Sequence, residues 1–125
     1  MQKTITPIDN TIYVEREYHS AKIEQTIENS TKAHKEWANL NVKDRVKLLK
    51  NFVEDFLSRG DVIGEELSRQ MGRPISQAAG ELNGFKERAE YMLKIAEKKL
   101  ANIDVTGNNN FKSYIKRRSL GIVFV

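Results

Sequence analysis

The sequence of 125 residues predicts an α/β fold, and three features of the chain predict it. Two short segments that alternate apolar and polar residues come first, between residues 4 and 16. Four stretches with helical periodicity follow, from Ser20 to about Ala101. The chain then reaches LGIVFV, residues 120–125, an unbroken apolar run. Such a run is typical of a strand that is covered on both faces, as in a parallel sheet.

The composition is that of an ordinary globular chain, with 39% hydrophobic and 30% charged residues, which excludes disordered and collagen-like classes. No apolar run approaches the roughly 20 residues that span a bilayer, so no membrane partner is expected. The amino terminus, MQKTITPIDNT, lacks the apolar core of a secretory signal, and we therefore expect a cytoplasmic protein.

The sequence contains no cysteine, which excludes disulfides, cysteine zinc sites and a cysteine nucleophile within these residues. His19 and His34 lie fifteen residues apart and have no third partner in a ligand spacing, so no metal site is predicted. The net charge of +4 comes from 21 basic and 17 acidic residues that mostly alternate, which is typical of solvated helix faces. The one local excess is Lys116, Arg117 and Arg118.

The first half of the chain predicts a hairpin and two helices. Residues 4–16, TITPIDNTIYVER, predict two short strands with Asp9 and Asn10 in their turn. Ser20 is expected to cap the first helix. The residues that share one face of this helix are Ile23, Ile27, Ser30, His34 and Trp37. Asn41 and Asp44 are expected to form a capping pair for the second helix.

Glycines and one proline predict where the later helices begin and end. Gly60 is expected to end the second helix, and Asp61 to cap a short third helix that Gly72 ends. Pro74 suits the first turn of the fourth and longest helix, because its missing N–H costs nothing there. The apolar stripe of this helix continues to about Ala101.

Gly80 and Gly84 lie one turn apart in the fourth helix, although a glycine weakens a helix by roughly 1 kcal/mol relative to alanine. Small residues at this spacing either let another backbone approach closely or leave open space beside the helix. Of the two arrangements, close packing is the expected one.

The end of the sequence predicts two further strands. Residues 111–119, FKSYIKRRS, alternate and predict an exposed or half-exposed strand, and residues 120–125 predict a fully buried one. A strand that is buried on both faces needs parallel neighbours and crossover helices, which a short hairpin cannot supply. We therefore expect this sequence to be the front part of a larger α/β protein.

These segments together resemble the amino-terminal portion of the NAD(P)-dependent aldehyde dehydrogenase superfamily. The resemblance covers roughly residues 5–125, and it rests on the order and spacing of five segments rather than on any one of them. They are ITPIDNTIYVER, AHKEWANLNVKDRVKLLKNF, ELSRQMGRPISQAAGEL, the long fourth helix and FKSYIKRRSLGIVFV. Ser119 departs from the family, which usually has proline before Leu-Gly. Gln70 stands where an acidic residue is usual and helps some members to hold a monovalent cation, so no cation site is expected.

The resemblance implies a protein that oxidises a small-molecule aldehyde to a carboxylic acid with NAD or NADP as cofactor. In the family a cysteine thiolate attacks the aldehyde, and the thiohemiacetal passes hydride to the nicotinamide before water releases the acid. The cysteine, the glutamate base and the asparagine of a Pro-Trp-Asn motif all come from residues that follow such a segment. No catalytic, cofactor-binding or metal residue is therefore assigned here, and the chain alone is expected to be inactive and to bind no cofactor.

The resemblance also implies how the chain is divided. Residues 1–110 are the amino-terminal hairpin and the helical part of the cofactor-binding domain, residues 111–119 are a strand of the oligomerisation element, and residues 120–125 are the first strand of the nucleotide-binding sheet. A homo-oligomer is implied, which accounts for the basic cluster without nucleic acid. The residues expected in the oligomerisation strand are Phe111, Ser113, Tyr114, Ile115, Lys116 and Arg117.

In the family, the first half of the long helix lines the tunnel through which the aldehyde reaches the cysteine. The resemblance implies that Gly84 leaves room in this tunnel, that Phe85 forms an apolar wall and that Arg88 favours an anionic substrate. The alternative is that Phe85 belongs to the helical core and that Arg88 is a solvated charge.

Two other functions fit the same residues. A self-contained helical interaction module would pair its strand tail with the sheet edge of another protein. A basic nucleic-acid-binding helical domain rests only on the pI of about 9.3 and the cluster at residues 116–118.

Overall fold

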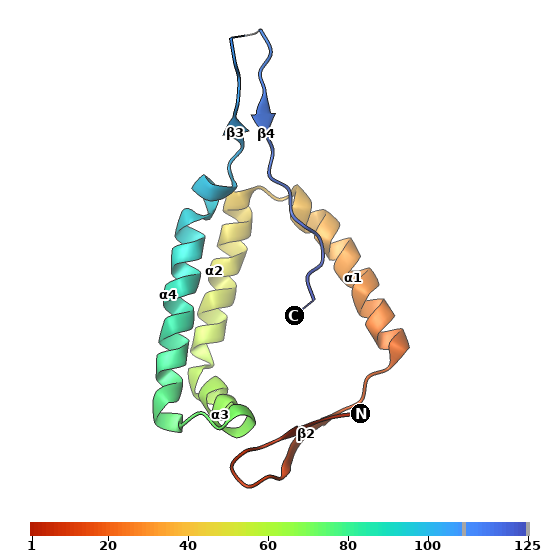
Figure 1. Cartoon of the computed structure of the whole chain (residues 1–125), viewed down its shortest axis with the longest axis vertical. Coiled ribbons are helices and arrows are strands. Elements are labelled where there is room, and N and C mark those ends of the chain that lie inside the picture. Colours follow the sequence, from red (N-terminus) through yellow and green to blue (C-terminus); the bar gives the residue numbers. More distant parts are fainter. Residues whose placement is uncertain (109, 125) are drawn as a thin grey trace.

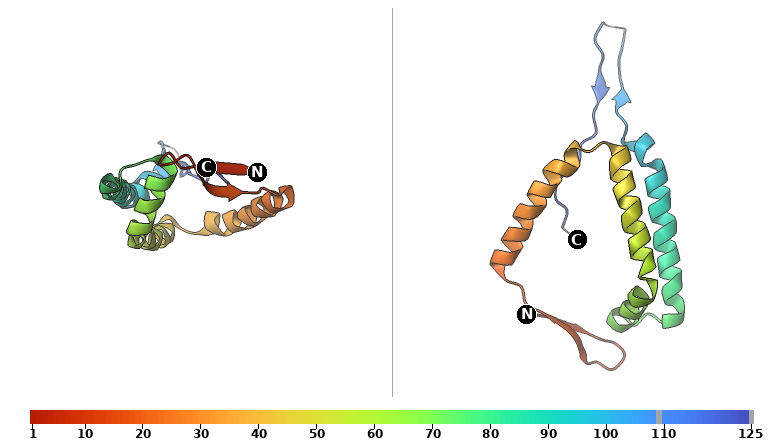
Figure 2. Two further views of the ribbon diagram at one scale, coloured as in Figure 1. Left: turned by 90° about the horizontal axis from the view of Figure 1, so that it is seen from below. Right: turned by 180° about the vertical axis from the view of Figure 1, so that it is seen from behind.

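The computed structural model describes residues 1–108 and 110–124, which form an open arrangement of helices and two hairpins. The elements are β1 (Gln2–Ile5), β2 (Ile12–Arg16), α1 (Ser20–Asn39), α2 (Val42–Ser58), α3 (Gly60–Met71), α4 (Ile75–Leu100), β3 (Ile103–Asp104) and β4 (Tyr114–Ile115). Figure 1 shows α2 and α4 side by side with α3 at their lower end, while α1 runs apart from them. The hairpin β1–β2 lies at the lower end of the molecule, and the ribbon β3–β4 projects from the upper end (Figure 2).

The predicted hairpin is confirmed, together with its turn residues. β1 and β2 pair antiparallel, with Gln2 opposite Arg16. Asn10 has a φ of 60°, a left-handed conformation that asparagine tolerates better than most residues. The Asp9 carboxylate accepts hydrogen bonds from the backbone N–H of Thr11 at 3.0 Å and from its hydroxyl at 2.7 Å. These two bonds close the turn and hold the pKa of Asp9 below its ordinary value.

α1 begins where the sequence predicts, but its cap differs. Ser20 is the first helical residue rather than the cap, and His19 precedes the helix without a side-chain capping bond. Ile23 and Ile27 share the predicted apolar face, yet they are 48% and 53% exposed, and α1 contributes no buried residue. The apolar face of α1 is thus present without a close partner among the described helices.

The joint between α1 and α2 is fixed by side chains of the α2 amino terminus. Asn41 is the predicted cap, since its Oδ1 accepts the N–H of Asp44 at 2.9 Å. The Arg45 guanidinium donates two hydrogen bonds, of 3.0 and 2.8 Å, to the carbonyl of Leu40. The same guanidinium lies 5.8 Å from the ring centroid of Trp37 near the end of α1. Arg45 therefore connects the last turn of α1 to the first turn of α2.

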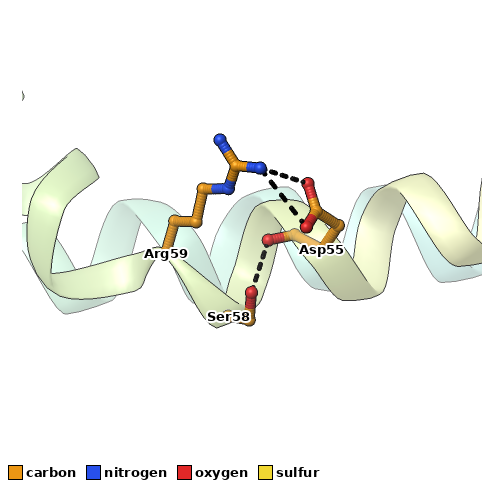
Figure 3. A network of polar contacts seen from close by, with 3 residues as sticks. All are labelled: Asp55, Ser58 and Arg59. Carbon is orange, nitrogen blue, oxygen red and sulfur yellow. Dashed lines mark hydrogen bonds and ion pairs between the residues drawn. The ribbon is translucent and has the colours of Figure 1, made fainter.

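Gly60 does not end α2, which corrects the prediction. α2 ends at Ser58, and Gly60 is the first residue of α3, so that Arg59 alone separates the two helices. Gly60 lacks the positive φ of a left-handed stop. Arg59 is also the residue that precedes α3, so Asp61 is not its cap but lies in its first turn, where a carboxylate is favourable. Figure 3 shows Arg59 paired with Asp55 at 3.0 Å and the Ser58 hydroxyl donating to the Asp55 carbonyl at 2.7 Å.

Gly72 ends α3 as predicted, in the left-handed conformation with a φ of 72°. Its N–H donates to the Ser68 carbonyl at 2.9 Å. Pro74 is the N-cap of α4 rather than a residue of its first turn, which corrects the prediction, and α4 ends at Leu100, within one residue of the predicted end. The hairpin turn packs against this corner, because a Cβ added to Gly72 would lie 2.8 Å from Cγ of Pro7.

The buried core is small and lies where α2 and α3 pack on α4. A Cβ added to Gly64 would lie 3.0 Å from Cβ of Ala78, so α3 and α4 approach closely at this point. The expected close packing at Gly80 and Gly84 is wrong, because a Cβ at either position would meet no atom within 4 Å. The buried residues are Thr6, Val46, Val53, Gly64 and Ala78.

The ribbon at the upper end is shorter than predicted. β3 and β4 pair antiparallel, with Ile103 opposite Ile115. Of the strand predicted over residues 111–119, Tyr114 and Ile115 are in β4, and the sequence did not predict its partner β3. Residues 120–124 form no strand, and Val125 lies outside the described residues. Because both described sheets are two-stranded and antiparallel, the parallel cofactor-binding strand stays a prediction.

Within residues 1–108 and 110–124, every helix is too short or too polar to cross a membrane.

Gly72→Ala is expected to lower the free energy of unfolding by roughly 1–2 kcal/mol, because alanine disfavours the left-handed backbone, with a further loss from the contact with Pro7. Gly80→Ala is the control, since it adds a methyl group to open helix surface and should raise the free energy of unfolding by up to about 1 kcal/mol. Urea unfolding followed by circular dichroism measures both. Equal effects of the two substitutions would contradict the packing described at Gly72.

Candidate functional site

The three residues predicted to face a substrate tunnel lie in the first half of α4, in different surroundings. The half-buried ring of Phe85 packs against the Phe56 ring of α2, with centroids 4.5 Å apart and planes inclined by 46°. Arg88 is exposed. Gly84 is half-buried and has open space where a side chain would project. Phe85 thus contacts α2, and both the tunnel role of the three residues and its alternative stay predictions.

A shallow groove follows the line where α2 and α4 meet. Its walls include the apolar side chains of Val53 and Leu93, and its rim carries charges of both signs. The charged residues are Lys50, Glu54, Glu90, Lys94 and Glu97. Because the signs alternate, the groove favours neither an anion nor a cation.

A second groove, more apolar and larger at about 800 Å³, lies between the start of α1 and the end of the described chain. Ile23 and Ile27 of α1 form one wall, and Val123 and Phe124 contribute to the other. This groove brings together segments that are about a hundred residues apart in the sequence. Residues 122–124 thus face the first half of α1 across this groove, and Figure 1 shows the chain end between α1 and α2.

A polar network attaches the hairpin to α3 through Glu66. The Tyr13 hydroxyl donates to Oε1 of Glu66 at 2.9 Å, and the Gln70 amide donates to Oε2. The Arg69 guanidinium lies 5.8 Å from the Tyr13 ring centroid and pairs with Glu65 at 2.8 Å. The Gln70 bond, followed by the Tyr13 bond, holds the pKa of Glu66 below its ordinary value. The bond to Glu66 raises the pKa of Tyr13 in turn.

Gln70 thus acts as a donor to a carboxylate, at the position where the family usually has an acidic residue. The Gln70 amide nitrogen donates its hydrogen bond to Oε2 of Glu66. Over residues 1–108 and 110–124, no group of three histidine, aspartate or glutamate side chains is placed to hold a metal ion.

The described residues do not fit a dinucleotide cofactor. Such sites use parallel strands that lead into helix amino termini. Both sheets in the described ranges are instead antiparallel pairs. The sequence also has no cysteine that could attack an aldehyde. The inactivity of these residues by themselves stays a prediction.

The residues predicted for the oligomerisation strand lie on the projecting ribbon and just after it. Phe111 is 76% exposed, and Tyr114 and Ile115 are about half exposed. Ser113 is paired within the ribbon, since its carbonyl accepts the N–H of Val105 at 3.0 Å. Lys116 and Arg117 are exposed and follow β4. The ribbon thus presents apolar side chains to solvent beside a basic segment, and its role in assembly stays a prediction.

The chain belongs to the aldehyde dehydrogenase family, because the family model matches residues 2–125. The predicted resemblance is therefore confirmed. No curated protein matches the sequence.

Three solved structures share the fold. Succinic semialdehyde dehydrogenase from Streptococcus pyogenes, in complex with NADP⁺ as the cofactor, superposes with a TM-score of 0.76 at 18% identity over 90% of this chain and 25% of that one. An aldehyde dehydrogenase from Brucella melitensis biovar abortus 2308 gives a TM-score of 0.73 at 22% identity, over 86% of this chain and 22% of that one. A 3,6-anhydro-L-galactose dehydrogenase in complex with NAP gives 0.72 at 21% identity, over 87% and 23%. The chain thus spans about a quarter of the length of these proteins.

Sequence reasoning did not find one contact within a helix and two tertiary contacts. The bond between Glu66 and Gln70 had a signal, since residues four apart face each other on a helix. The link from Tyr13 to Glu66 had none, because it joins residues 53 positions apart. The same holds for the contact of His34 with Ser119, which are 85 positions apart.

Gln70→Ala is expected to raise the pKa of Glu66 toward its ordinary value of 4.5. The reason is that this substitution removes the hydrogen bond that lowers the pKa most. Since the folded-state pKa of Glu66 is lowered, this carboxylate stabilises the fold above its ordinary pKa, and the contribution disappears as the pH falls through the folded-state pKa. Carbon-13 NMR titration of the Glu66 carboxyl group measures the change. Gln25→Ala, which removes a bond to Asn29 on α1, should leave the Glu66 titration where it was.

Proposed function

We propose that this chain is the amino-terminal part of an NAD(P)-dependent aldehyde dehydrogenase that oxidises an aldehyde to a carboxylic acid through a cysteine thiohemiacetal. The observation that carries the proposal is the match of the family model across residues 2–125. Two of the similar structures bind NADP⁺ or NAP, which supports a nicotinamide dinucleotide as the cofactor of the longer protein. The absence of cysteine from the sequence supports the view that these 125 residues alone are inactive.

The proposal assigns a part to each region of the chain. Residues 1–110 contribute the hairpin and helices of the cofactor-binding domain, residues 111–119 contribute to the oligomerisation element of a homo-oligomer, and residues 120–125 begin the nucleotide-binding sheet. The exposure of the last region supports this assignment, since Leu120 is 99% and Phe124 is 100% exposed. Covering apolar side chains of this kind is favourable, at about 25 cal/mol for each Å² buried. Neighbouring strands of a longer protein would provide that cover.

A self-contained interaction module remains the second candidate, because an exposed apolar segment also suits pairing with the sheet edge of another protein. The apolar groove between α1 and residues 122–124 favours it. The two candidates differ in what the coding sequence contains after Val125.

The coding sequence after Val125 is expected to encode Pro-Trp-Asn within a few residues and a cysteine further on. The extended protein should then reduce NAD⁺ or NADP⁺ when an aldehyde is added, measured by the absorbance of the reduced nicotinamide. Replacement of that cysteine by serine should abolish the reaction, since it removes the thiolate nucleophile. A downstream sequence without these residues, or an extended protein inactive with both cofactors over a panel of aldehydes, would refute the proposal.

We also propose that Gly84, Phe85 and Arg88 line the substrate tunnel of the extended enzyme. The open space at Gly84 supports this role, because an aldehyde could pass beside the bare helix surface there. The packing of Phe85 on Phe56 fixes this turn of α4 against α2. The exposed Arg88, one turn further along, would attract an anionic substrate.

Gly84→Trp in the extended enzyme is expected to raise KM for bulky aldehydes by about tenfold, because overpacking a confined site costs roughly 1–3 kcal/mol. The affinity for the dinucleotide should stay unchanged. Lys86→Trp is the matched control, since residues two apart project to different sides of a helix and Lys86 is exposed. Steady-state kinetics over aldehydes of increasing size distinguish the two variants. An unchanged KM across the series in Gly84→Trp would count against the tunnel.

A further inference from the structure

We infer that His34 is a positioning residue whose hydrogen bond to Ser119 sets the direction of the tail, here residues 116–124. Nε2 of His34, in the second half of α1, lies 3.0 Å from the hydroxyl oxygen of Ser119. Both residues are half-buried, whereas Arg118 and Leu120 on either side of Ser119 are exposed. Ser119 is thus the point at which the tail is held against α1.

Little else in the described tail restrains its path. Residues 116–124 form no strand, and Gly121 has a φ of 117°, a conformation that is open to glycine and that other residues rarely adopt. Val123 and Phe124 border the groove of α1, but they are 69% and 100% exposed, so their apolar contacts are slight. The position of the tail beside α1 therefore depends strongly on the bond at Ser119.

The chemistry of the pair makes this bond independent of the tautomer of the imidazole. A neutral imidazole can accept from the serine hydroxyl or donate to it through Nε2, depending on its tautomer. The contact is therefore compatible with either neutral tautomer. A side-chain amide of similar reach could replace the imidazole, because it also donates and accepts.

The sequence indicates why this chain needs such a restraint. A proline at position 119 would fix its own φ near −65° through the ring, whereas serine leaves the backbone free to rotate. The bond from His34 supplies a constraint that serine lacks. If the proposed function holds, the same bond aims the chain into the first strand of the nucleotide-binding sheet, and this last step alone rests on that proposal.

The absence of cysteine allows the tail to be followed with two spin labels. Labels at Glu28→Cys on α1 and Phe124→Cys on the tail, both exposed positions, report their separation by double electron–electron resonance. The parent chain is expected to give one narrow distance distribution. His34→Ala should reduce the ratio of held to released tail about fivefold, which corresponds to a net hydrogen-bond contribution of ~1 kcal/mol.

His19→Ala is the matched control, because His19 is exposed and its imidazole lies 3.8 Å from the Glu17 carboxylate on its own side of the groove. It should leave the distribution narrow. His34→Gln should restore most of the held population. In a double-mutant cycle, His34→Ala should have no further effect once Ser119→Ala has removed the hydroxyl.

A distance distribution in His34→Ala that matches that of His19→Ala would overturn the inference, and so would full additivity of His34→Ala and Ser119→Ala. Circular dichroism checks that α1 remains helical. If His34→Ala disturbs the helix, Ser119→Ala tests the same bond from a position outside every helix. This distance measurement does not involve aldehyde turnover. A negative result would therefore not affect the proposed function, and a failure of the proposed function would not affect the distance measurement.

Discussion

The close approach of α3 to α4 at Gly64 and Ala78 is the contact on which most of the structure depends. A side chain larger than hydrogen at Gly64 would require Ala78 to shift by a few tenths of an ångström, because a Cβ added there would lie 3.0 Å from that of Ala78. The hairpin is attached to α3 rather than to α4, through the bond of Tyr13 to Glu66 and the contact of Pro7 with Gly72. The packing of α3 on α4 therefore determines where β1 and β2 lie.

α2 and α4 form the other half of this unit, with Val46 and Val53 buried and Phe56 packed on Phe85. α1 and the tail lie outside it and keep many apolar side chains in contact with solvent. Burial of apolar surface is the main favourable term in folding, so this distribution separates a part that is already packed from a part that needs further cover. The match to the aldehyde dehydrogenase family and the share of about a quarter of its solved members agree with that division.

The sequence predicted those features whose cause is local. Asn41 with Asp44 and the left-handed Gly72 were identified because a cap and a helix stop are properties of a few neighbouring residues. Gly60 and Asp61 were misassigned, since a helix can restart after one residue without any left-handed glycine. The spacing of Gly80 and Gly84 could not reveal whether anything packs on them, because that depends on elements elsewhere in the chain.

The candidate site was less accessible to sequence reasoning than the helices were. The family and the order of its segments could be identified, but the surroundings of Phe85 depend on Phe56, which lies in another helix. The strand that was predicted over residues 120–125, and that residues 120–124 do not form, shows a related limit. The apolar pattern of these residues indicates that they are suited to burial. A strand forms, however, only when a neighbouring strand supplies the hydrogen-bond partners.

The chain has a single tryptophan, Trp37, and the Arg45 guanidinium covers its ring at the junction of α1 and α2. The intrinsic indole fluorescence of the molecule therefore originates at one corner, where the outlying helix joins the packed unit. Spectroscopists thus have a built-in reporter on this junction, with no second indole in the chain to obscure it.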